Sequence, residues 1–218
     1  MLLDNLIQNL IILKNDGIDY IPVNKETLDK IEKLEIEVRN CSQCHLSETR
    51  KNIVFGEGDV NAELMFVGEA PGANEDEQGK PFVGEAGKLL TRIITAMNLT
   101  REKVYIANIL KCRPPENRNP LPEEINKCIA YLMAQINIIN PKIICCLGKI
   151  STQTLLGTKE PIHRIRGKIF DFNGIKIVPT YHPSHLLHHP ENKKYVWNDM
   201  QLIMKLLRNS SGDNPISE

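Results

Sequence analysis

Residues 64–76 read LMFVGEAPGANED, and this stretch decides the fold. Its first four residues form a short apolar run of the kind that becomes a buried strand, and the glycine-rich segment 68–76 follows directly. Further apolar runs at 104–107 and 143–147 alternate with helical segments. Such alternation indicates βαβ units, in which helices join parallel strands. The sequence therefore predicts an α/β protein whose ligand loops follow the carboxyl ends of its strands.

Amphipathic helices fill the intervals between these runs. Segment 85–98 carries apolar residues on one helical face, and another helix opens at Pro122, since proline is favoured at the first helical position. A last helix is expected over about 192–207. Asn173-Gly174, between two β-rich runs, predicts the tight turn of a β-hairpin.

The pattern changes near both ends of the chain. Residues 1–36 alternate apolar and charged groups at roughly helical spacing, which predicts a helical N-terminal extension. One domain is expected over 37–208, and the polar tail 209–218 is expected to fray.

Composition sets outer bounds on the protein class. The chain has 218 residues, of which 41% are hydrophobic and 25% charged, as in an ordinary globular domain. Because no apolar run is long enough to span a bilayer and no export signal opens the chain, we expect a cytoplasmic protein that is not bound to a membrane.

Net charge gives no general argument for a nucleic-acid partner. The formal charge is zero, from 27 basic and 27 acidic residues, so DNA binding would need a local basic face. Two stretches offer candidates for that face: Lys111, Arg113 and Arg118, and Arg164, Arg166 and Lys168.

Four of the six cysteines have the pattern of a metal site. Cys41 and Cys44 form a C-x-x-C pair in a short polar stretch, and Cys112 and Cys128 lie farther along the chain. Four thiolates can hold either zinc or a [4Fe–4S] cluster, and spacing does not separate the two. The adjacent pair 145–146 lies in an apolar run, so we interpret it as core.

Three segments carry the remaining polar chemistry. Segment 68–76 lacks the residues of a Walker loop and the G-x-G-x-x-G spacing, so it is not a nucleotide-phosphate loop. Segment 79–84 holds Phe82 between glycines, where the ring is either core or placed for a ligand. Segment 179–190 gathers four histidines, but no zinc-protease motif, so one histidine placed by its neighbouring proline is the simpler interpretation.

Taken in order, these segments resemble the family 4 uracil-DNA glycosylases. The resemblance rests on CSQC, GEAPGANED, GKPFVG, NILKCRPPENR and YHPSHLL, with Cys128 in its place, and it covers about residues 41–207. It implies a three-layer α/β/α sandwich with a central, mainly parallel four-stranded sheet. It also implies a [4Fe–4S] cluster, held by Cys41, Cys44, Cys112 and Cys128.

The resemblance further implies a role for each matching residue. Phe82 stacks on the extruded base, Asn108 hydrogen-bonds its Watson–Crick edge, and His182 meets O2 of uracil. Glu69 and Ala70 line the sugar side of the pocket.

The resemblance also implies residues that shape the pocket and residues that contact the DNA. Asn117 supports the pocket, while Glu75 shapes it or organises the attacking water. Leu186 and Leu187 are interpreted as two exposed residues that fill the gap left in the duplex. The other substrate-binding positions are Gly72 and Ser184.

The implied reaction is hydrolysis of the bond between uracil and deoxyribose, which leaves an abasic site. The best-studied enzymes of this superfamily have aspartate where Ala70 stands, so a carboxylate must act from elsewhere, and we expect Glu75 ahead of Glu69. The loop 113–120 lacks the insert of a related covalent trapping group, which favours turnover. The expected partner is uracil-containing DNA, single- or double-stranded, bound by a monomer.

Three other functions remain open on the sequence. The first is a non-catalytic binder of damaged DNA with the same fold, and the second is a zinc-stapled α/β hydrolase of small molecules. The third is a glycosylase for another deaminated base, such as hypoxanthine.

Overall fold

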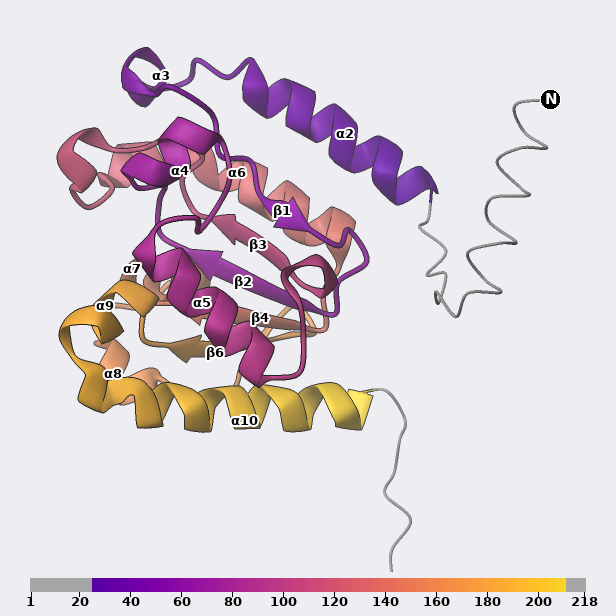
Figure 1. The fold of residues 1–218 in the computed structure, drawn as a ribbon. Coiled ribbons are helices and arrows are strands. Elements are labelled where there is room, and N and C mark those ends of the chain that lie inside the picture. The colour runs from indigo at the N-terminus through magenta and orange to yellow at the C-terminus, as the bar shows by residue number, and fades with distance from the viewer. Residues whose placement is uncertain (1–24, 211–218) are drawn as a thin grey trace, which may run out of the picture.

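The computed structural model describes residues 25–210, arranged as three layers around one sheet (Figure 1). Within this range the sheet has six strands in the order β1-β3-β2-β4-β6-β5. Their bounds are Glu57–Gly58 for β1, Leu64–Gly68 for β2, Tyr105–Asn108 for β3, Ile143–Leu147 for β4, Phe170–Phe172 for β5 and Ile175–Thr180 for β6.

The four central strands β3, β2, β4 and β6 are parallel, as the alternating pattern predicts. The predicted four-stranded sheet is extended by a short antiparallel strand at each edge, β1 on β3 and β5 on β6. The predicted hairpin joins β5 to β6, and Asn173 adopts a left-handed φ of 52° in its turn.

Helices cover both faces of the sheet. The long ones are α2 (Lys25–Arg39), α5 (Glu85–Ala96), α6 (Pro122–Ile139), α7 (Lys149–Leu156) and α10 (Lys193–Ser210). The short ones are α3 (Leu46–Thr49), α4 (Ala73–Gln78), α8 (Ile162–Ile165), α9 (Pro183–His188), and the 3-10 turns η1 (Arg101–Lys103), η2 (Pro115–Asn117) and η3 (Pro190–Asn192). None of the described helices has the length and apolar character needed to cross a membrane.

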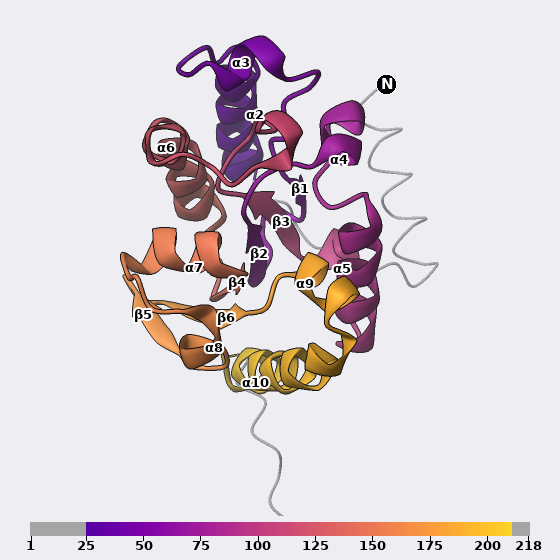
Figure 2. The same ribbon diagram turned by 90° about the vertical axis from the view of Figure 1, so that its left-hand side faces the viewer.

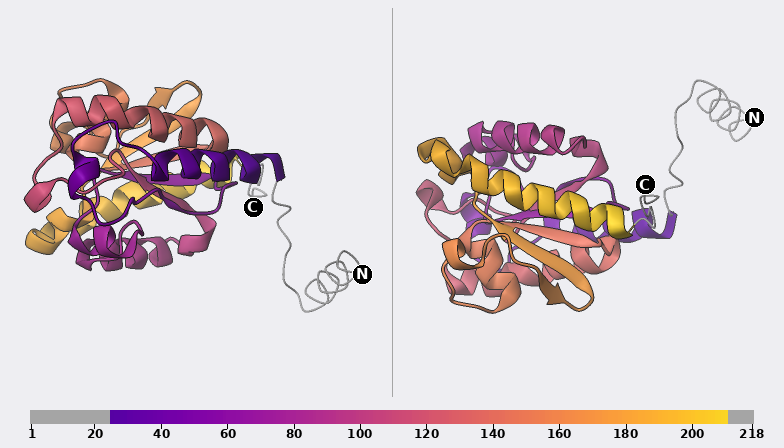
Figure 3. Two further views of the ribbon diagram at one scale, coloured as in Figure 1. Left: turned by 90° about the horizontal axis from the view of Figure 1, so that it is seen from above. Right: turned by 90° about the horizontal axis from the view of Figure 1, so that it is seen from below.

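Side chains of each central strand alternate between two cores because a pleated strand points successive residues to opposite faces. Met65, Val67 and Cys146 pack with α2, α6 and α7, whereas Phe66 and Cys145 pack with α5, α9 and α10. Cys145 and Cys146 are fully buried, which confirms that both are core residues. The α/β/α sandwich is thereby confirmed, and α2 and α10 lie on opposite sides of the domain (Figure 3).

The helix α2 includes the expected boundary between residues 36 and 37 and packs on α6 through Ile31, Leu34 and Val38. Residues 25–36 therefore contribute to the core of the domain. The rest of the expected extension, and the tail beyond residue 210, lie outside the described residues. Residues 209–210, which we expected to fray, continue α10.

Candidate active site

A large cavity lies at the carboxyl edge of the parallel strands. The helices α4, α7 and α9 lie at this edge (Figure 2). The volume of the cavity is about 380 Å³, and it opens to solvent. Parallel strands end at the same edge, so the loops after β2, β3, β4 and β6 all reach it. The structure brings nine of the predicted site residues into its lining: Glu69, Ala70, Gly72, Glu75, Phe82, Asn108, Asn117, His182 and Ser184.

The two leucines of α9 differ in exposure. Leu187 is 44% exposed, as a residue that enters DNA must be, but Leu186 is 1% exposed and packs against α5 and α10. The expectation that both are exposed is therefore wrong for Leu186. Adjacent helical residues point about 100° apart, so one can face the core while the next faces solvent.

Asn108 ends β3 at the floor of the cavity. Its side chain is buried, and its Oδ1 atom has no hydrogen-bond partner among the described residues. A buried amide oxygen without a donor is costly, by roughly 1–3 kcal/mol. Asn108 therefore contributes an unused hydrogen-bond acceptor beside the cavity that it lines.

His182 follows β6 and caps α9. Its Nδ1 accepts the backbone N–H of Ser184 at 3.2 Å, with the Ser184 hydroxyl 2.7 Å away. Burial lowers the pKa of His182 to about 4, against the opposing effect of Glu75, so the ring is neutral at pH 7. Since Nδ1 is an acceptor, the proton of the neutral ring is on Nε2, which makes Nε2 a hydrogen-bond donor.

Phe82 is held in an uncommon backbone conformation with φ 52°. The Arg101 guanidinium donates to the carbonyls of Pro81 and Phe82, at 2.7 and 3.1 Å. On the other side, the Glu75 carboxylate accepts from the backbone of Val83 at 2.9 Å. This clamp fixes the ring against the His182 ring, with 5.6 Å between centroids.

The two glutamates of the first loop have different roles. Glu75 accepts backbone N–H groups from Gly72, Val83 and Gly84, at 2.9 to 3.1 Å. These bonds join the two pocket loops and occupy both carboxylate oxygens. The expectation that Glu75 activates water ahead of Glu69 is therefore not supported by its surroundings.

Glu69 is the carboxylate that faces the cavity without such bonds in the described part of the chain. Burial raises its pKa, while the nearby Lys149 ammonium acts in the opposite direction. A partly buried carboxylate with a free oxygen can accept a proton from water.

Sequence reasoning missed two residues of this site. Lys149 lines the cavity directly after β4 and Gly148, and the rule that ligand loops follow strand ends could have found it. Arg101 contacts the Phe82 loop from about twenty residues away, and no local signal marks it.

The predicted basic stretches are only partly available to DNA. Lys111 is 1% exposed and therefore cannot meet phosphates, and burial lowers its pKa to about 8. Arg118 pairs with the buried Glu124 at 2.6 Å, and Arg166 pairs with the buried Asp199. Arg164 and Lys168 are exposed, and Arg113 is partly exposed.

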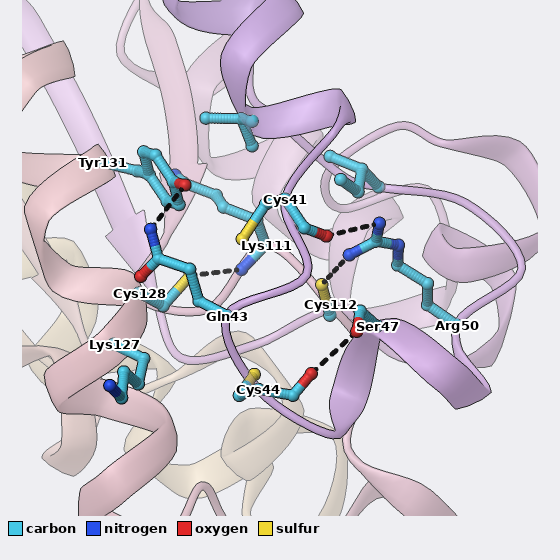
Figure 4. Close-up of a pocket in the computed structure, with 12 residues that line it drawn as sticks. Cys41, Gln43, Cys44, Ser47, Arg50, Lys111, Cys112, Lys127, Cys128 and Tyr131 are labelled. Carbon is cyan, nitrogen blue, oxygen red and sulfur yellow. Dashed lines mark hydrogen bonds between the residues drawn. The ribbon is translucent and has the colours of Figure 1, made fainter.

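A second, much smaller cavity lies between the segment before α3, the loop after β3 and α6 (Figure 4). Cys41, Cys44, Cys112 and Cys128 all line it. The Arg50 guanidinium donates to Cys112 Sγ at 3.2 Å, and the Lys111 backbone N–H donates to Cys128 Sγ at 3.3 Å. Burial raises the pKa of Cys128 to about 11, although the nearby Lys111 ammonium acts in the opposite direction.

No group of three or more His, Cys, Asp or Glu side chains among residues 25–210 is arranged to hold a single metal ion. The histidine segment instead forms a stack, in which His185 lies between Tyr181 and His189 at centroid distances of 4.9 and 4.5 Å. The four cysteines lie elsewhere, around the smaller cavity.

Comparison with known proteins places this chain in a family. A sequence model of the uracil DNA glycosylase superfamily matches residues 55–201. The type-4 uracil-DNA glycosylase of Saccharolobus solfataricus is 47% identical over 189 residues, which cover 83% of this chain and 88% of that protein. The type-4 enzyme of Archaeoglobus fulgidus is 42% identical, covering 83% of this chain and 94% of that protein.

A bacterial relative agrees with the archaeal ones. The type-4 uracil-DNA glycosylase of Thermotoga maritima is 45% identical over 175 residues, covering 78% of this chain and 91% of that protein. Identity at this level over most of both chains shows common descent and a common fold. The chain belongs to the uracil-DNA glycosylase superfamily, in its type-4 family.

Proposed function

We propose that this protein excises uracil from DNA by hydrolysing its N-glycosidic bond, and so begins base excision repair. The observation that carries the proposal is the buried, unpartnered Asn108 Oδ1 at the floor of a cavity that Phe82 and His182 also line. Uracil matches this arrangement: N3–H donates to Oδ1, and the amide NH₂ donates to O4. Cytosine has no hydrogen on N3 and an amino group at position 4, so both contacts fail.

The pocket suits an extruded nucleotide. A base in a duplex must leave the stack before its sugar bond can be reached, at a cost of a few kcal/mol. Stacking on Phe82 and the contacts of Asn108 offset that cost. The exposed Leu187, on the helix next to His182, fills the gap that the nucleotide leaves.

The reaction separates charge across the bond from C1′ to N1. Positive charge develops on the sugar and negative charge on the leaving uracil. His182 donates from Nε2 to O2 of uracil and stabilises that anion without needing to be protonated. The Ser184 N–H at Nδ1 fixes the ring orientation before the substrate arrives, so no reorganisation is needed during the reaction.

Glu69 positions and deprotonates the water that attacks C1′. Ala70 has no functional group there, and the oxygens of Glu75 are engaged by the backbone of the pocket loops. The Lys149 ammonium, near Glu69 at the mouth of the cavity, favours the ionised carboxylate. We expect the protein to act as a monomer on single- or double-stranded DNA in the cytoplasm.

A direct assay tests the function. The protein is incubated with oligonucleotides that contain one uracil, cytosine or hypoxanthine, and free base and alkali-labile sites are measured. We expect release of uracil alone. Tight binding to the uracil strand without formation of abasic sites would identify a non-catalytic binder. Release of hypoxanthine in preference to uracil would show that the enzyme is specific for another base.

Replacing Glu69 by glutamine is expected to slow uracil release by about 100-fold or more, because the water loses its base. In the wild type, the rate should fall as the pH decreases through the Glu69 pKa, which burial places above that of an ordinary glutamate. This acid limb should be absent from the pH–rate profile of the variant. Glu77→Gln, on the exposed side of α4, is the matched control and should leave both rate and profile unchanged. If the acid limb were unchanged in Glu69→Gln, Glu69 would not be the base that deprotonates the water.

We also propose that Cys41, Cys44, Cys112 and Cys128 hold a [4Fe–4S] cluster. The donor set fits, since four thiols from three segments line one cavity and two of the sulfurs accept N–H bonds. When bound, the cluster supplies four iron–thiolate bonds that join the segment before α3 to the loop after β3 and to α6. These bonds are a structural cross-link near the pocket.

Replacing Cys112 by serine should therefore lower stability and activity together. Loss of a structural metal site belongs to the class of changes that cost about 4 kcal/mol or more. In a chain of this size, this corresponds to a fall in melting temperature of roughly 10 °C. Calorimetry with iron analysis checks the prediction, and Cys145→Ser in the strand core is the contrast that should retain iron. Full stability without iron would show that the cross-link is dispensable.

A further inference from the structure

One buried cation, Lys111, lines the cysteine cavity and reaches the residue that ends β3 in the uracil pocket. The Lys111 side chain is 1% exposed, and its Nζ is 2.9 Å from the backbone carbonyl of Asn108 and 2.6 Å from Oε1 of Gln135. Its own backbone N–H donates to Cys128 Sγ. No carboxylate forms an ion pair with Lys111 in the described part of the chain: its Nζ is hydrogen-bonded to two neutral oxygens, and the nearby Cys128 sulfur is the group whose charge favours the ammonium.

Such an arrangement is expensive, because an ammonium without a carboxylate loses most of its hydration for two neutral hydrogen bonds. A leucine or methionine would fill the same space without that loss. We therefore expect the Lys111 ammonium to have a function as a hydrogen-bond donor. It donates to the backbone carbonyl of Asn108, the residue that ends β3 in the pocket.

Two other uses of this lysine do not fit its place. It cannot contact DNA phosphates, since its side chain is buried. Nor is it among the residues that line the uracil cavity, so its amine does not meet C1′ of a bound nucleotide.

We propose that Lys111 is a positioning residue that fixes Asn108, and so links the cysteine site to the reading of the base. The inference rests on the proposed function. Asn108 is the last residue of β3, where the strand leaves the sheet, and the next two backbone N–H groups already bond to Gly68 and Glu69. With its carbonyl held by the ammonium, the peptide plane of Asn108 is fixed on both sides. The Oδ1 atom then stays aimed at the position of uracil N3–H.

The second partner of the ammonium fixes the lysine in turn. Gln135 Nε2 donates to the Phe55 carbonyl at 3.0 Å and to the Tyr105 hydroxyl at 3.1 Å, so Oε1 can only face Lys111. The network therefore runs from the core under α6 to the pocket floor, and only its Lys111 end touches Asn108.

The test compares Lys111→Met with Gln135→Met in iron-loaded protein. Both variants remove a buried hydrogen-bonding group from one network, but only the first releases Asn108. We measure inhibition by free uracil, affinity for an oligonucleotide with an abasic site, melting temperature and the visible absorbance of the cluster per chain. Lys111→Met should weaken uracil binding by about 10-fold or more, while its affinity for abasic DNA, which does not use Asn108, stays within about twofold. Gln135→Met should lower the melting temperature and weaken uracil binding clearly less than Lys111→Met does, because the bond from Nζ to the Asn108 carbonyl is kept.

Lys111→Gln, which keeps an N–H donor, should recover part of the uracil affinity and provides the comparison if Lys111→Met does not fold. Uracil affinity equal to that of the wild type in both Lys111 variants would overturn the inference. The inference would also be overturned if Lys111→Met lost affinity for uracil and for abasic DNA to the same extent while its melting temperature fell. That result would indicate a purely structural role. If the wild type released no uracil, the proposed function would be wrong. This result differs from the outcomes that would overturn only the role of Lys111.

Discussion

Replacing His182 by alanine is expected to slow uracil release by about 100- to 1000-fold, the usual effect of removing one preorganised donor to a developing anion. The Nε2–H of the neutral ring is the donor, because Nδ1 accepts from Ser184. Single-turnover kinetics on a uracil oligonucleotide measures the loss. Affinity for abasic DNA should change little, since the donor acts on the base.

Alanine at this position also removes the N-cap of α9, which is worth about 1 kcal/mol. His182→Asn separates the two effects. Asparagine is a good N-cap residue, so its melting temperature should return toward that of the wild type, but its shorter side chain cannot reach O2. If His182→Asn recovered the rate along with the stability, His182 would be a capping residue and not the donor.

Replacing Gly68 by alanine should reduce uracil release by at least about 100-fold, although this residue touches no substrate. A Cβ there would lie closer than 3.0 Å to Asn108 Oδ1 and to two atoms of the Phe82 ring. Neither neighbour can yield: Asn108 is buried at the end of a strand, and Phe82 is clamped by Arg101 and Glu75. Misplacement of a binding group by about 1 Å is enough for a loss of this size.

The matched control is Gly84→Ala at the end of the Phe82 loop, directly before α5. There φ is −74°, and the nearest atom to an added Cβ is the Asn74 amide, at the flexible end of a side chain. Its activity should remain within a few-fold of the wild type. The readout for Gly68→Ala is the ratio of uracil to abasic-DNA affinity, since overpacking alone costs roughly 1–3 kcal/mol of stability and would leave this ratio unchanged.

Much of this architecture is predictable because its signals are local. The run 64–67, the proline at position 122 and the turn at 173–174 each specify backbone geometry within a few residues. Parallel strands then bring their following loops to one edge, so Asn108 and His182 meet although 74 positions separate them. The pattern of apolar residues also placed Cys145 and Cys146 in the core, distinct from the four cysteines of the cavity.

What sequence reasoning could not supply depends on contacts between distant segments. Glu75 and Glu69 look equivalent until the backbone N–H groups of residues 83 and 84 fold onto one of them. The burial of Leu186 but not Leu187 depends on where α9 lies against α5. The Lys111 side chain points into the protein, where it bonds to Gln135 on α6, 24 positions farther along the chain.

The two edge strands of the sheet affect how the protein behaves in concentrated solution. The outermost strands, β1 and β5, have only two and three residues, and Glu57 and Asp171 place a negative charge on each. Long, flat, uncharged edges are what allow separate molecules to pair strand to strand and aggregate. Because this sheet offers no such edge in the described range, we expect concentrated solutions of the folded protein to resist amyloid-like association.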